Sequence, residues 1–344
     1  MKIKVAVLFG GQSTEHEVSR CSAASVLKNI NAGKYDVYPI GITKDGKWFE
    51  YKGSYDKIED GSWEKDEFYK EDGYRILFNN EVDVIFPVLH GLYGEDGTVQ
   101  GLCKFLNIPC VGPSVLSSAL CMDKVYTKYL LDKFNIPQAD YVAFNKYEYA
   151  KDKESYIKAI NEKLPFPVFI KPSNSGSSVG ITKAHNENEL KAGIEEALKY
   201  DSRILVEEGI NAKEVEVAVI GNENPEASIP GEIVPAKEFY DYEAKYSNSN
   251  SKLLIPADLS ETKLEEVRNI AKKVYTILDC EGMSRVDFLV DKDTSKIYLN
   301  EVNTIPGFTK ISMYPKLWEK SGLPYDKLID KLIELALLKN KKDR

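Results

Sequence analysis

Two neighbouring segments near the C-terminus carry charged and amide side chains whose spacing could bind a metal ion. The runs VDFLV and KIYLNEVN are rich in β-branched and aromatic residues, and the turn residues DKDTSK join them, so together they predict a β-hairpin. With the turn midway between the strands, Asp287 lies opposite Glu301 and Arg285 lies opposite Asn303. Because side chains alternate along a strand, all four share one face. Two carboxylates and an amide oxygen suit Mg²⁺. Phosphate oxygens and water complete the coordination of this ion.

The same hairpin face has a second interpretation. It is a solvated strand face on which Arg285 pairs with a glutamate across the hairpin. The run NEVNTIPG, however, continues into a Pro-Gly turn that can present backbone N–H groups to a ligand. This continuation favours the metal site.

The N-terminal segment has the pattern of a strand, a glycine turn and a helix. KIKVAVLFG predicts a buried strand that runs into Gly10 and Gly11, and EVSRCSAASVLKNI predicts a helix that Thr14 and Glu17 could begin as a capping box. The pattern is typical of the first half of a doubly wound α/β unit, which binds ligands at the carboxyl ends of its strands. Glu15 follows such an end, either as a ligand-binding residue or as an ordinary acidic residue of the first helical turn.

Two other predicted strands also end at candidate site residues. VDVIFPVL ends at His90, which is either a buried histidine with satisfied hydrogen bonds or a site residue. FPVFIKPS contains Lys171 and is followed by the small-residue loop NSGSSVGI, which either closes over a triphosphate or is a plain hairpin loop. The loop lacks the G-x-x-x-x-G-K-[ST] pattern of a Walker loop. Lys171, together with Lys124 upstream, favours phosphate contact.

Three further candidates lie between predicted strands or in a polar segment. Glu207 and Glu214 flank a predicted turn, where exposed edge charges are the alternative interpretation. The segment FYDYEAKYSNSNSK, which contains Lys245, is aromatic, polar and without strong periodicity. This composition predicts a functional lid loop and not a part of the core.

The remaining segments predict the elements that position these residues. Residues 44–81 are charged and aromatic without a clear period, so we expect short strands and surface loops there. Helices are expected from about Thr98 to Leu106 and at 150–163, 187–199 and 260–279. The run PYDKLIDKLIELALLKNKK predicts an amphipathic helix with a lysine-rich end that complements its dipole.

Length and composition limit the class of protein. The chain has 344 residues, which predicts two or three modules. Hydrophobic residues make up 43% and charged residues 29%, as in soluble globular proteins. The net charge of −8 argues against non-specific nucleic-acid binding, and no long apolar run or signal peptide indicates a membrane protein. The five widely spaced cysteines are typical of buried thiols in a reducing compartment, so we expect a cytoplasmic protein.

Several short blocks occur along the chain in one order: GGQSTEHEVS, HGLYGEDGTVQG, MDK, KPSNSGSSVGI, EVEVAVIGN, FYDYEAKY, RVDFLV and NEVNTIPGFT. Together they resemble the D-alanine–D-alanine ligase family of the ATP-grasp superfamily, from near residue 3 to about residue 337. The resemblance implies an α/β fold in which an N-terminal doubly wound parallel-sheet module precedes a two-lobed ATP-grasp unit. The implied domains are residues 1–122 on the substrate side, 123–208 as the central lobe, and 209–344 as the C-terminal lobe with the lid loop and the Mg-binding hairpin.

The resemblance implies an ATP-dependent ligase that joins two D-alanines into D-alanyl-D-alanine, through a D-alanyl phosphate, for peptidoglycan precursor synthesis. ATP is then a co-substrate, and two Mg²⁺ (or Mn²⁺) ions are cofactors. Asp287 and Glu301 would hold one ion, and Glu301 and Asn303 the other. The implied ATP contacts are Lys124 and Lys171 with the α and β phosphates, Glu207 with the adenine edge, Glu214 with the ribose and Lys245 with the γ-phosphate.

The resemblance also implies roles on the amino-acid side of the site. Arg285 and the Gly307 N–H would stabilise the tetrahedral oxyanion that forms when the second amine attacks. Glu15 would hold the ammonium group of the first D-alanine, in a hydrogen-bonded set with Ser177 and Tyr246 that closes the lid. The other implied contacts are His90 near the first D-alanine, Ser312 at the carboxylate of the second, and Met313 beside its methyl group.

Other specificities and other classes of protein are alternatives. Some relatives that form D-alanyl-D-serine carry arginine where this chain has Met313. The alternative interpretation of Met313 is a residue that only fills the core. Relatives that form the D-lactate ester depart from the lid sequence EAKY. Another ATP-grasp ligase should lack EHEVS and FYDYEAKY, and a module that binds ATP without turnover should lack a metal ligand or Arg285. An NAD-dependent oxidoreductase needs a complete glycine fingerprint, which is absent here. The resemblance also implies a homodimer.

Overall fold

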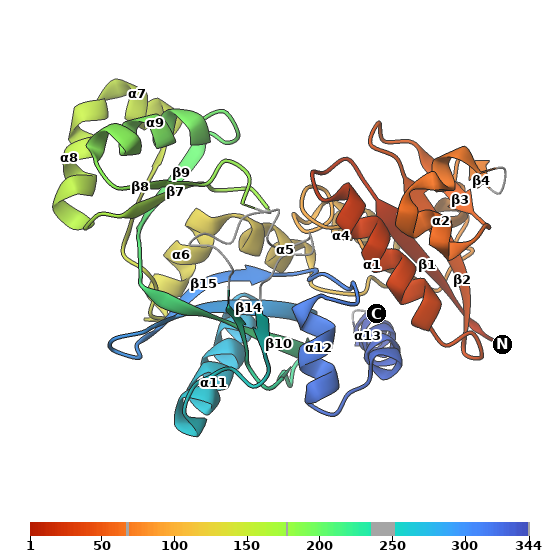
Figure 1. Ribbon diagram of the computed structural model, residues 1–344. Coiled ribbons are helices and arrows are strands. Elements are labelled where there is room, and N and C mark those ends of the chain that lie inside the picture. The colour runs from red at the N-terminus through yellow and green to blue at the C-terminus, as the bar shows by residue number, and fades with distance from the viewer. Residues whose placement is uncertain (67–68, 177, 235–251, 343–344) are drawn as a thin grey trace.

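The chain folds into sheets that are covered by helices, which confirms the predicted α/β class (Figure 1). The computed structural model describes residues 1–66, 69–176, 178–234 and 252–342. In these ranges the strands form three sheets, which follow one another along the chain. Figure 1 places the N-terminal sheet and the four-stranded sheet at opposite ends of the molecule, with the six-stranded sheet between them. Within the same ranges, no helix has the length and apolar character needed to cross a membrane.

The N-terminal sheet has a parallel centre and an antiparallel edge. Its order is β4-β3-β2-β1-β5, and β2, β1 and β5 are parallel whereas β3 and β4 join them antiparallel. The strands are β1 (Ile3–Gly10), β2 (Tyr35–Ile42), β3 (Trp48–Tyr51), β4 (Tyr69–Glu71) and β5 (Val84–Pro87). The helices of this part of the chain are α1 (His16–Asn29), α2 (Tyr55–Asp60), the 3₁₀ helix η1 (Ser62–Lys65), α3 (Arg75–Phe78), α4 (Thr98–Leu106) and α5 (Val115–Met122), of which α5 contacts β15 of the third sheet.

The start of α1 differs from the predicted capping box. The helix begins at His16, and Glu15 occupies the cap position without a side-chain cap hydrogen bond. Glu17 pairs instead with the Lys44 Nζ at 2.5 Å. The prediction that Thr14 and Glu17 form a capping box is therefore wrong, because Glu17 binds Lys44 from another loop.

Residues 44–81 contribute more to the core than predicted. Tyr51 and Trp63 are fully buried. The Trp63 ring packs edge-on against Phe9 of β1, with ring centroids 5.0 Å apart. Because large aromatic side chains remove much apolar surface from water, this segment helps to hold β1 in place. The expected short strands are present as β3 and β4, whereas the helices α2, η1 and α3 were not predicted.

The second sheet is antiparallel and has the order β6-β9-β7-β8. The helix predicted at 150–163 is divided into two, because Asp152 ends the first helix and its side chain accepts the N–H of Ser155 to cap the second. The strands are β6 (Tyr141–Asn145), β7 (Val168–Pro172), β8 (Thr182–Ala184) and β9 (Arg203–Glu208). The helices are α6 (Lys124–Lys133), α7 (Lys146–Lys151), α8 (Lys153–Lys163) and α9 (Glu187–Ala197).

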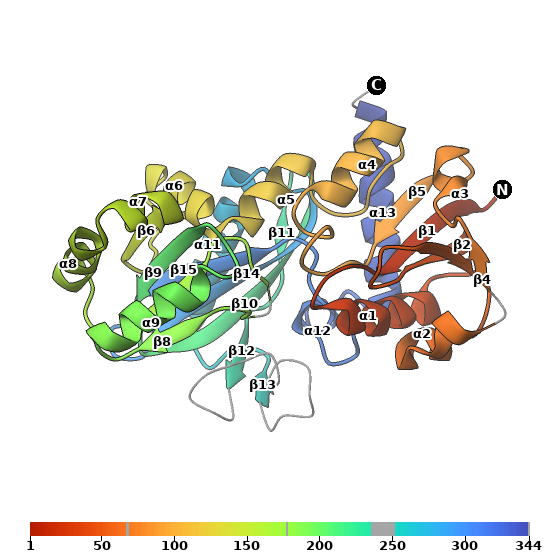
Figure 2. The same cartoon turned by 90° about the horizontal axis from the view of Figure 1, so that it is seen from above.

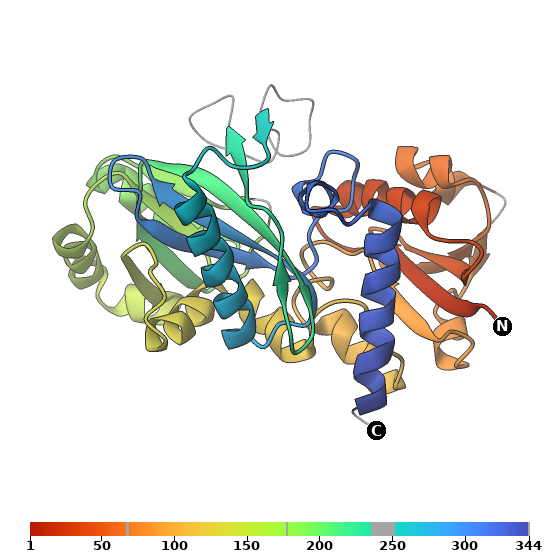
Figure 3. The same ribbon diagram turned by 90° about the horizontal axis from the view of Figure 1, so that it is seen from below.

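The third sheet is also antiparallel and has the order β13-β12-β10-β14-β15, with β11 paired to β10. Its strands are β10 (Ala212–Gly221), β11 (Glu226–Ala227), β12 (Gly231–Val234), β13 (Lys252–Leu254), β14 (Gly282–Asp291) and β15 (Ile297–Asn303). Its helices are α11 (Glu261–Ile277), α12 (Met313–Lys320) and α13 (Tyr325–Lys342). Figures 2 and 3 show α13 between this sheet and the N-terminal sheet, and it contacts α1, β5 and β14.

The hairpin of β14 and β15 has the predicted register at its functional end. Arg285 lies opposite Asn303, and Asp287 lies opposite Glu301. The register then shifts, because Phe288 pairs with Leu299 and leaves Asn300 as the extra residue of a β-bulge. The bulge was not predicted.

One hydrophobic core joins the N-terminal sheet to the C-terminal part of the chain. Val7 of β1, Ala218 of β10 and Leu332 of α13 are fully buried members of a single cluster. Because burial of this shared apolar surface is favourable, the loops of the N-terminal sheet are held against the six-stranded sheet. The functional residues of the two parts can therefore meet in one site.

Candidate functional site

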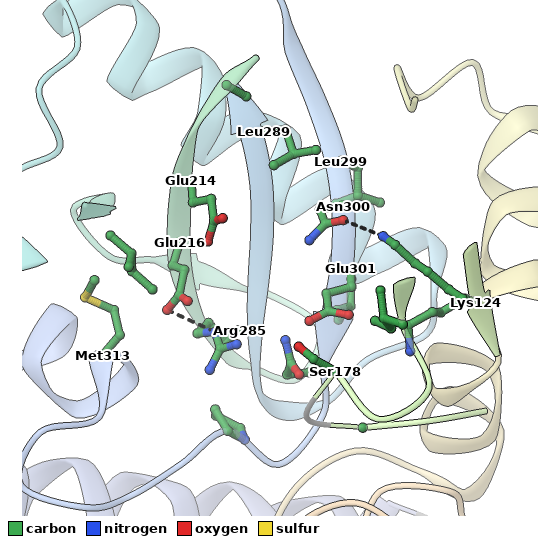
Figure 4. A pocket seen from close by; sticks show the side chains of 18 of the residues that line it. Lys124, Ser178, Glu214, Glu216, Arg285, Leu289, Leu299, Asn300, Glu301 and Met313 are labelled. Atoms are coloured by element: carbon green, nitrogen blue, oxygen red, sulfur yellow. Dashed lines mark hydrogen bonds and ion pairs between the residues drawn. The ribbon is translucent and has the colours of Figure 1, made fainter. Parts of the chain in front are cut away.

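A pocket lies where loops from the N-terminal sheet meet the other two sheets (Figure 4). Apart from Asp287, which Arg285 and Asn303 bind, every predicted site residue that the structure describes lines this pocket. These lining residues are Glu15, His90, Lys124, Lys171, Glu207, Glu214, Arg285, Glu301, Asn303, Gly307, Ser312 and Met313. The predicted site residues Ser177, Lys245 and Tyr246, with most of the predicted lid, lie outside the described residues.

Three acidic residues lie in a row across three strands of the six-stranded sheet. Glu216 on β10 is opposite Asp287 on β14, which is opposite Glu301 on β15. Residues opposite each other in an antiparallel pair share a face, with Cβ atoms about 5 Å apart. Glu214, two residues before Glu216, lies farther along the same strand, opposite Leu289. Sequence reasoning missed Glu216, because the run EVEVAVIGN carries no local sign of the strand that pairs with it.

Arg285 is held by two of these carboxylates. Its Nε donates to Asp287 Oδ1 at 2.8 Å and lies 3.0 Å from Glu216 Oε2, and its terminal nitrogen donates to Asp287 Oδ2 at 2.7 Å. Burial lowers the pKa of Arg285, but the charges of Asp287 and Glu216 outweigh burial and raise this pKa well above its ordinary value. The guanidinium therefore keeps a fixed positive charge at the wall of the pocket.

The hairpin residues have the donor chemistry of a magnesium site that needs further ligands. The Asn303 amide nitrogen donates to Asp287 Oδ2 at 2.8 Å, so its carbonyl oxygen is the atom that can bind a cation. Within the described ranges, no group of three or more His, Cys, Asp or Glu side chains is arranged to hold a metal ion. Mg²⁺ often binds through one or two carboxylates and completes its shell with phosphate and water, so this set fits an ion that arrives with a nucleotide.

A buried carboxylate at the other side of the pocket is bound by two lysines. Glu207 Oε2 lies 2.5 Å from Lys171 Nζ, and Glu207 Oε1 lies 2.6 Å from Lys128 Nζ. Burial raises the pKa of Glu207, but the two lysine charges outweigh burial and lower this pKa to about 2. Lys171 Nζ also lies 3.5 Å from the amide oxygen of the bulge residue Asn300. Sequence reasoning missed both Lys128 and Asn300.

Lys124 is fixed beside the Gly/Ser loop by the residue that precedes it. Asp123 caps α6 by accepting the N–H of Tyr126, and it also binds Arg203 of β9. Lys124 Nζ donates to the carbonyl oxygen of Ser175 at 2.6 Å. Lys124, the lysine of the MDK block, therefore contacts the loop that was predicted to cover a triphosphate.

Glu15 lies at the point where three loops converge. It is 5% exposed. A Cβ atom on Gly91 would lie 2.7 Å from Glu15 Oε2, and one on Gly176 would lie 2.8 Å from the same oxygen. Only glycine allows both backbones to approach the carboxylate this closely. Glu15 therefore faces the pocket, and its role as a ligand-binding residue stays a prediction.

His90 is both a satisfied buried histidine and a pocket residue. Its Nδ1 donates to the carbonyl oxygen of Ile305 at 2.9 Å, since a carbonyl can only accept. Its Nε2 then accepts from the Ser22 hydroxyl at 2.9 Å, and Ser22 Oγ accepts the N–H of Phe308 at 3.1 Å. Burial lowers the pKa of His90. The neutral ring thus ties α1 to the loop that follows β15.

Glu95 is a half-buried pocket residue that sequence reasoning did not select from the block HGLYGEDG. Its two carboxyl oxygens accept the N–H of Gly91 at 2.8 Å and the N–H of Ile305 at 3.1 Å. Burial and the charge of Glu15 raise the pKa of Glu95 to about 8, although both N–H groups oppose the rise. Glu95 therefore joins the loop after β5 to the loop after β15.

The loop after β15 ends at the N-terminus of α12. Ser312 precedes this helix, and its Oγ accepts the N–H of Thr309 at 3.0 Å without capping the helix itself. Unsatisfied N–H groups at a helix N-terminus attract anions such as a carboxylate. Met313 is 5% exposed and belongs to the hydrophobic core, and it also lines the pocket. Its predicted contact with a substrate stays a prediction.

Comparison with known families and relatives identifies the same set of proteins over the whole chain. A family model described as D-ala D-ala ligase N-terminus matches residues 4–113, and one described as D-ala D-ala ligase C-terminus matches residues 130–334. The D-alanine--D-alanine ligase of Clostridium acetobutylicum is 72% identical over 341 residues, which cover 99% of both chains. That of Clostridium novyi is 68% identical over 343 residues, covering 99% of this chain and 100% of the relative.

Solved structures extend the comparison to the fold. The VanG D-Ala:D-Ser ligase from Enterococcus faecalis has a TM-score of 0.88 and 40% identity, covering 98% of this chain and 100% of that chain. The D-alanine-D-alanine ligase from Coxiella burnetii has a TM-score of 0.83 and 34% identity, covering 99% of this chain and 96% of that chain.

Replacement of Glu95 by glutamine is expected to flatten the pH dependence of the free energy of unfolding. The ordinary pKa of this carboxyl is 4.5, whereas in the folded protein it is about 8. Between these values the native state binds more protons than the unfolded state, so the stability that Glu95 contributes at low pH is lost as pH rises towards about 8. Urea unfolding of both proteins across this range measures the effect, and equal pH dependences would contradict the assignment.

Proposed function

Because the chain belongs to the D-alanine–D-alanine ligase family, we propose that its pocket joins two D-alanines into D-alanyl-D-alanine, with ATP as co-substrate, for peptidoglycan precursor synthesis. The identity of 72% with a D-alanine--D-alanine ligase over 99% of both chains carries this conclusion. The family uses ATP together with a divalent metal. The homodimer and the cytoplasmic location implied by the resemblance are part of the proposal, as are the three domains 1–122, 123–208 and 209–344.

The reaction follows from the chemistry of amide formation. A carboxylate is a poor electrophile, so the γ-phosphoryl group of ATP is first transferred to a carboxylate oxygen of one D-alanine, which gives a D-alanyl phosphate and ADP. The amine of the second D-alanine attacks the acyl carbon, phosphate leaves with the original carboxylate oxygen, and the amine loses a proton. Cationic groups and N–H donors aimed at the developing charges lower the barriers of both steps.

On the nucleotide side, the proposal assigns charged residues to separate parts of ATP. Lys124 and Lys171 contact the α and β phosphates, which their places beside the Gly/Ser loop and at the pocket wall support. Glu207 accepts from the adenine amine and Glu214 from the ribose hydroxyls. Lys245, from the lid sequence, contacts the γ-phosphate.

Two Mg²⁺ ions complete the proposed nucleotide site, and Mn²⁺ could replace them. Asp287 and Glu301 would hold one ion, and Glu301 and Asn303 the second. When bound, these ions neutralise charge on the phosphates during transfer. Their donor set of two carboxylates and an amide supports this assignment.

On the amino-acid side, the proposal places the two substrates around the loop that follows β15. Glu15 holds the ammonium group of the first D-alanine beside His90, and Ser177 and Tyr246 close the lid over it. Arg285 and the Gly307 N–H stabilise the oxyanion, and the fixed charge of Arg285 supports its role. Ser312 and the N-terminus of α12 receive the second carboxylate, with Met313 beside the methyl group.

The second candidate function is a D-alanine–D-serine ligase of the same family. The similarity to the VanG D-Ala:D-Ser ligase, with a TM-score of 0.88, favours it. Met313 argues for D-alanine, because its side chain offers an apolar contact to a methyl group and no hydrogen-bond donor to the serine hydroxyl.

Phosphate release from ATP tests the proposed reaction directly. In the presence of Mg²⁺, release is expected to require D-alanine and to give one D-alanyl-D-alanine per phosphate, because each amide consumes one acyl phosphate. L-alanine is the matched control and should not support release, since its methyl group would project into the wrong side of the site. Release with L-alanine alone, or without dipeptide, would refute the proposal.

Glu301→Gln is expected to lower the rate of ligation by on the order of 10²-fold or more, because one carboxylate is proposed to bind both metal ions. Far-ultraviolet circular dichroism should remain that of the wild type. Glu226→Gln is a matched control, because Glu226 lies on β11 and pairs with Lys331 at 2.6 Å, away from the pocket. Near-wild-type turnover of a folded Glu301→Gln enzyme would rule out the metal assignment.

Competition between D-alanine, D-serine and D-lactate at equal concentrations tests the acceptor. D-alanyl-D-alanine should dominate the products identified by mass spectrometry. The preference over D-serine should be modest, because one hydroxyl in an apolar pocket changes binding by only ~1–3 kcal/mol. A product mixture dominated by D-alanyl-D-serine or by the ester would exclude the D-alanine preference while leaving the ligase reaction in place.

A further inference from the structure

A second lysine binds Glu207 from deeper in the protein than Lys171 does. The Lys128 side chain is 3% exposed and that of Lys171 is 16% exposed, while the Glu207 side chain between them is 5% exposed. Within the described ranges, the pocket wall includes Lys171 and Glu207 but not Lys128. Lys128 is therefore the inner partner of this carboxylate, and Lys171 is the partner that faces a ligand.

The position of Lys128 is set by contacts besides its ion pair with Glu207. It lies on α6, its Nζ is 3.4 Å from the carbonyl oxygen of Ala139, and it sits 5.0 Å from the centre of the Tyr141 ring. A cation beside an aromatic face and a carboxylate is favourable when it is buried. These contacts hold Lys128 beside Glu207.

If Lys171 were the only cation bound to Glu207, its movement towards a phosphate would require a large amount of free energy. A buried carboxylate that loses its counter-ion is strongly destabilised. With Lys128 in place, one lysine remains on Glu207 Oε1 at 2.6 Å. Lys171 is then released to bind phosphate, and Glu207 Oε2 becomes available to a donor.

We propose that Lys128 is a positioning residue that keeps Glu207 charged and oriented while Lys171 binds the nucleotide phosphates, and that it thereby supports selection of adenine. This inference rests on the proposed function, in which Glu207 accepts from the adenine amine. An ionised carboxylate can only accept hydrogen bonds. It therefore attracts the amine of adenine and repels the carbonyl oxygen that hypoxanthine carries at the same position.

Nucleotide binding and steady-state kinetics of Lys128→Met test the proposal. We expect the KM for ATP to rise about tenfold with a change in kcat of less than about threefold, because Lys171 stays on Glu207 and the chemical step is untouched. Calorimetric titration with ADP and with inosine diphosphate should show that the wild-type preference for ADP shrinks in the variant. Lys128→Arg, which keeps the charge, should restore most of the ADP affinity.

Lys163→Met is the matched control. Lys163 lies 5.4 Å from the centre of the same Tyr141 ring and donates to the Tyr141 carbonyl oxygen, but it does not line the pocket. It should leave the KM for ATP and the preference for ADP unchanged. If Lys128→Met has no larger effect than Lys163→Met, Lys128 does not act on nucleotide binding and the proposal fails.

Variants of Glu207 decide whether Lys128 acts through this carboxylate. Glu207→Gln and the double variant Glu207→Gln/Lys128→Met should bind ADP equally, because Lys128 then has no charge to position. The comparison holds even if Lys128→Met alone does not fold, since the double variant leaves no unpaired buried carboxylate. A further loss in the double variant would refute the inference.

If the wild type itself does not prefer ADP to inosine diphosphate, the proposed adenine contact of Glu207 is wrong, whereas the KM for ATP still reports on Lys128.

Discussion

The antiparallel register of β10, β14 and β15 is the constraint on which the rest of the site depends. It sets Glu216, Asp287 and Glu301 opposite one another on a single sheet face. Like charges directly across a sheet are destabilising, so neighbouring groups must offset them. Arg285 binds the first two, and the amide of Asn303 donates to Asp287. The result is a row of carboxylates on one face of the sheet, with the donor chemistry of a site for a divalent cation.

The other half of the site depends on hydrogen bonds between distant loops. His90 and Glu95, from the loop after β5, bind the backbone of Ile305 after β15. Ser22 joins the same network from α1 through His90 and Phe308. Because the N-terminal sheet and the C-terminal elements share one hydrophobic core, these polar contacts are made by parts that burial already holds together. The loop after β5, helix α1 and the loop after β15 are therefore joined next to Gly307.

Local chemistry explains where sequence-based predictions were wrong. Glu17 does not cap α1, because Lys44 from a neighbouring loop binds it. The segment around Trp63 was expected to form short strands and surface loops because its charged residues hide the period, yet its aromatic side chains also fill the space against β1. Asn300 enters the pocket wall through a bulge, and a bulge shifts the register without any mark in the alternation of side chains.

The sequence by itself determined the hairpin pairing of Asp287 with Glu301 and of Arg285 with Asn303, because a short turn joins the two strands and alternation fixes the shared face. It also determined the family, through blocks that keep their order along the whole chain. Only the tertiary structure decided that Glu216 completes the row, that Lys128 is buried against Glu207, and that Glu95 joins two loops at the pocket. The physical reason is that these contacts join segments far apart in sequence, and long-range pairing is set by packing of the whole core and not by local spacing.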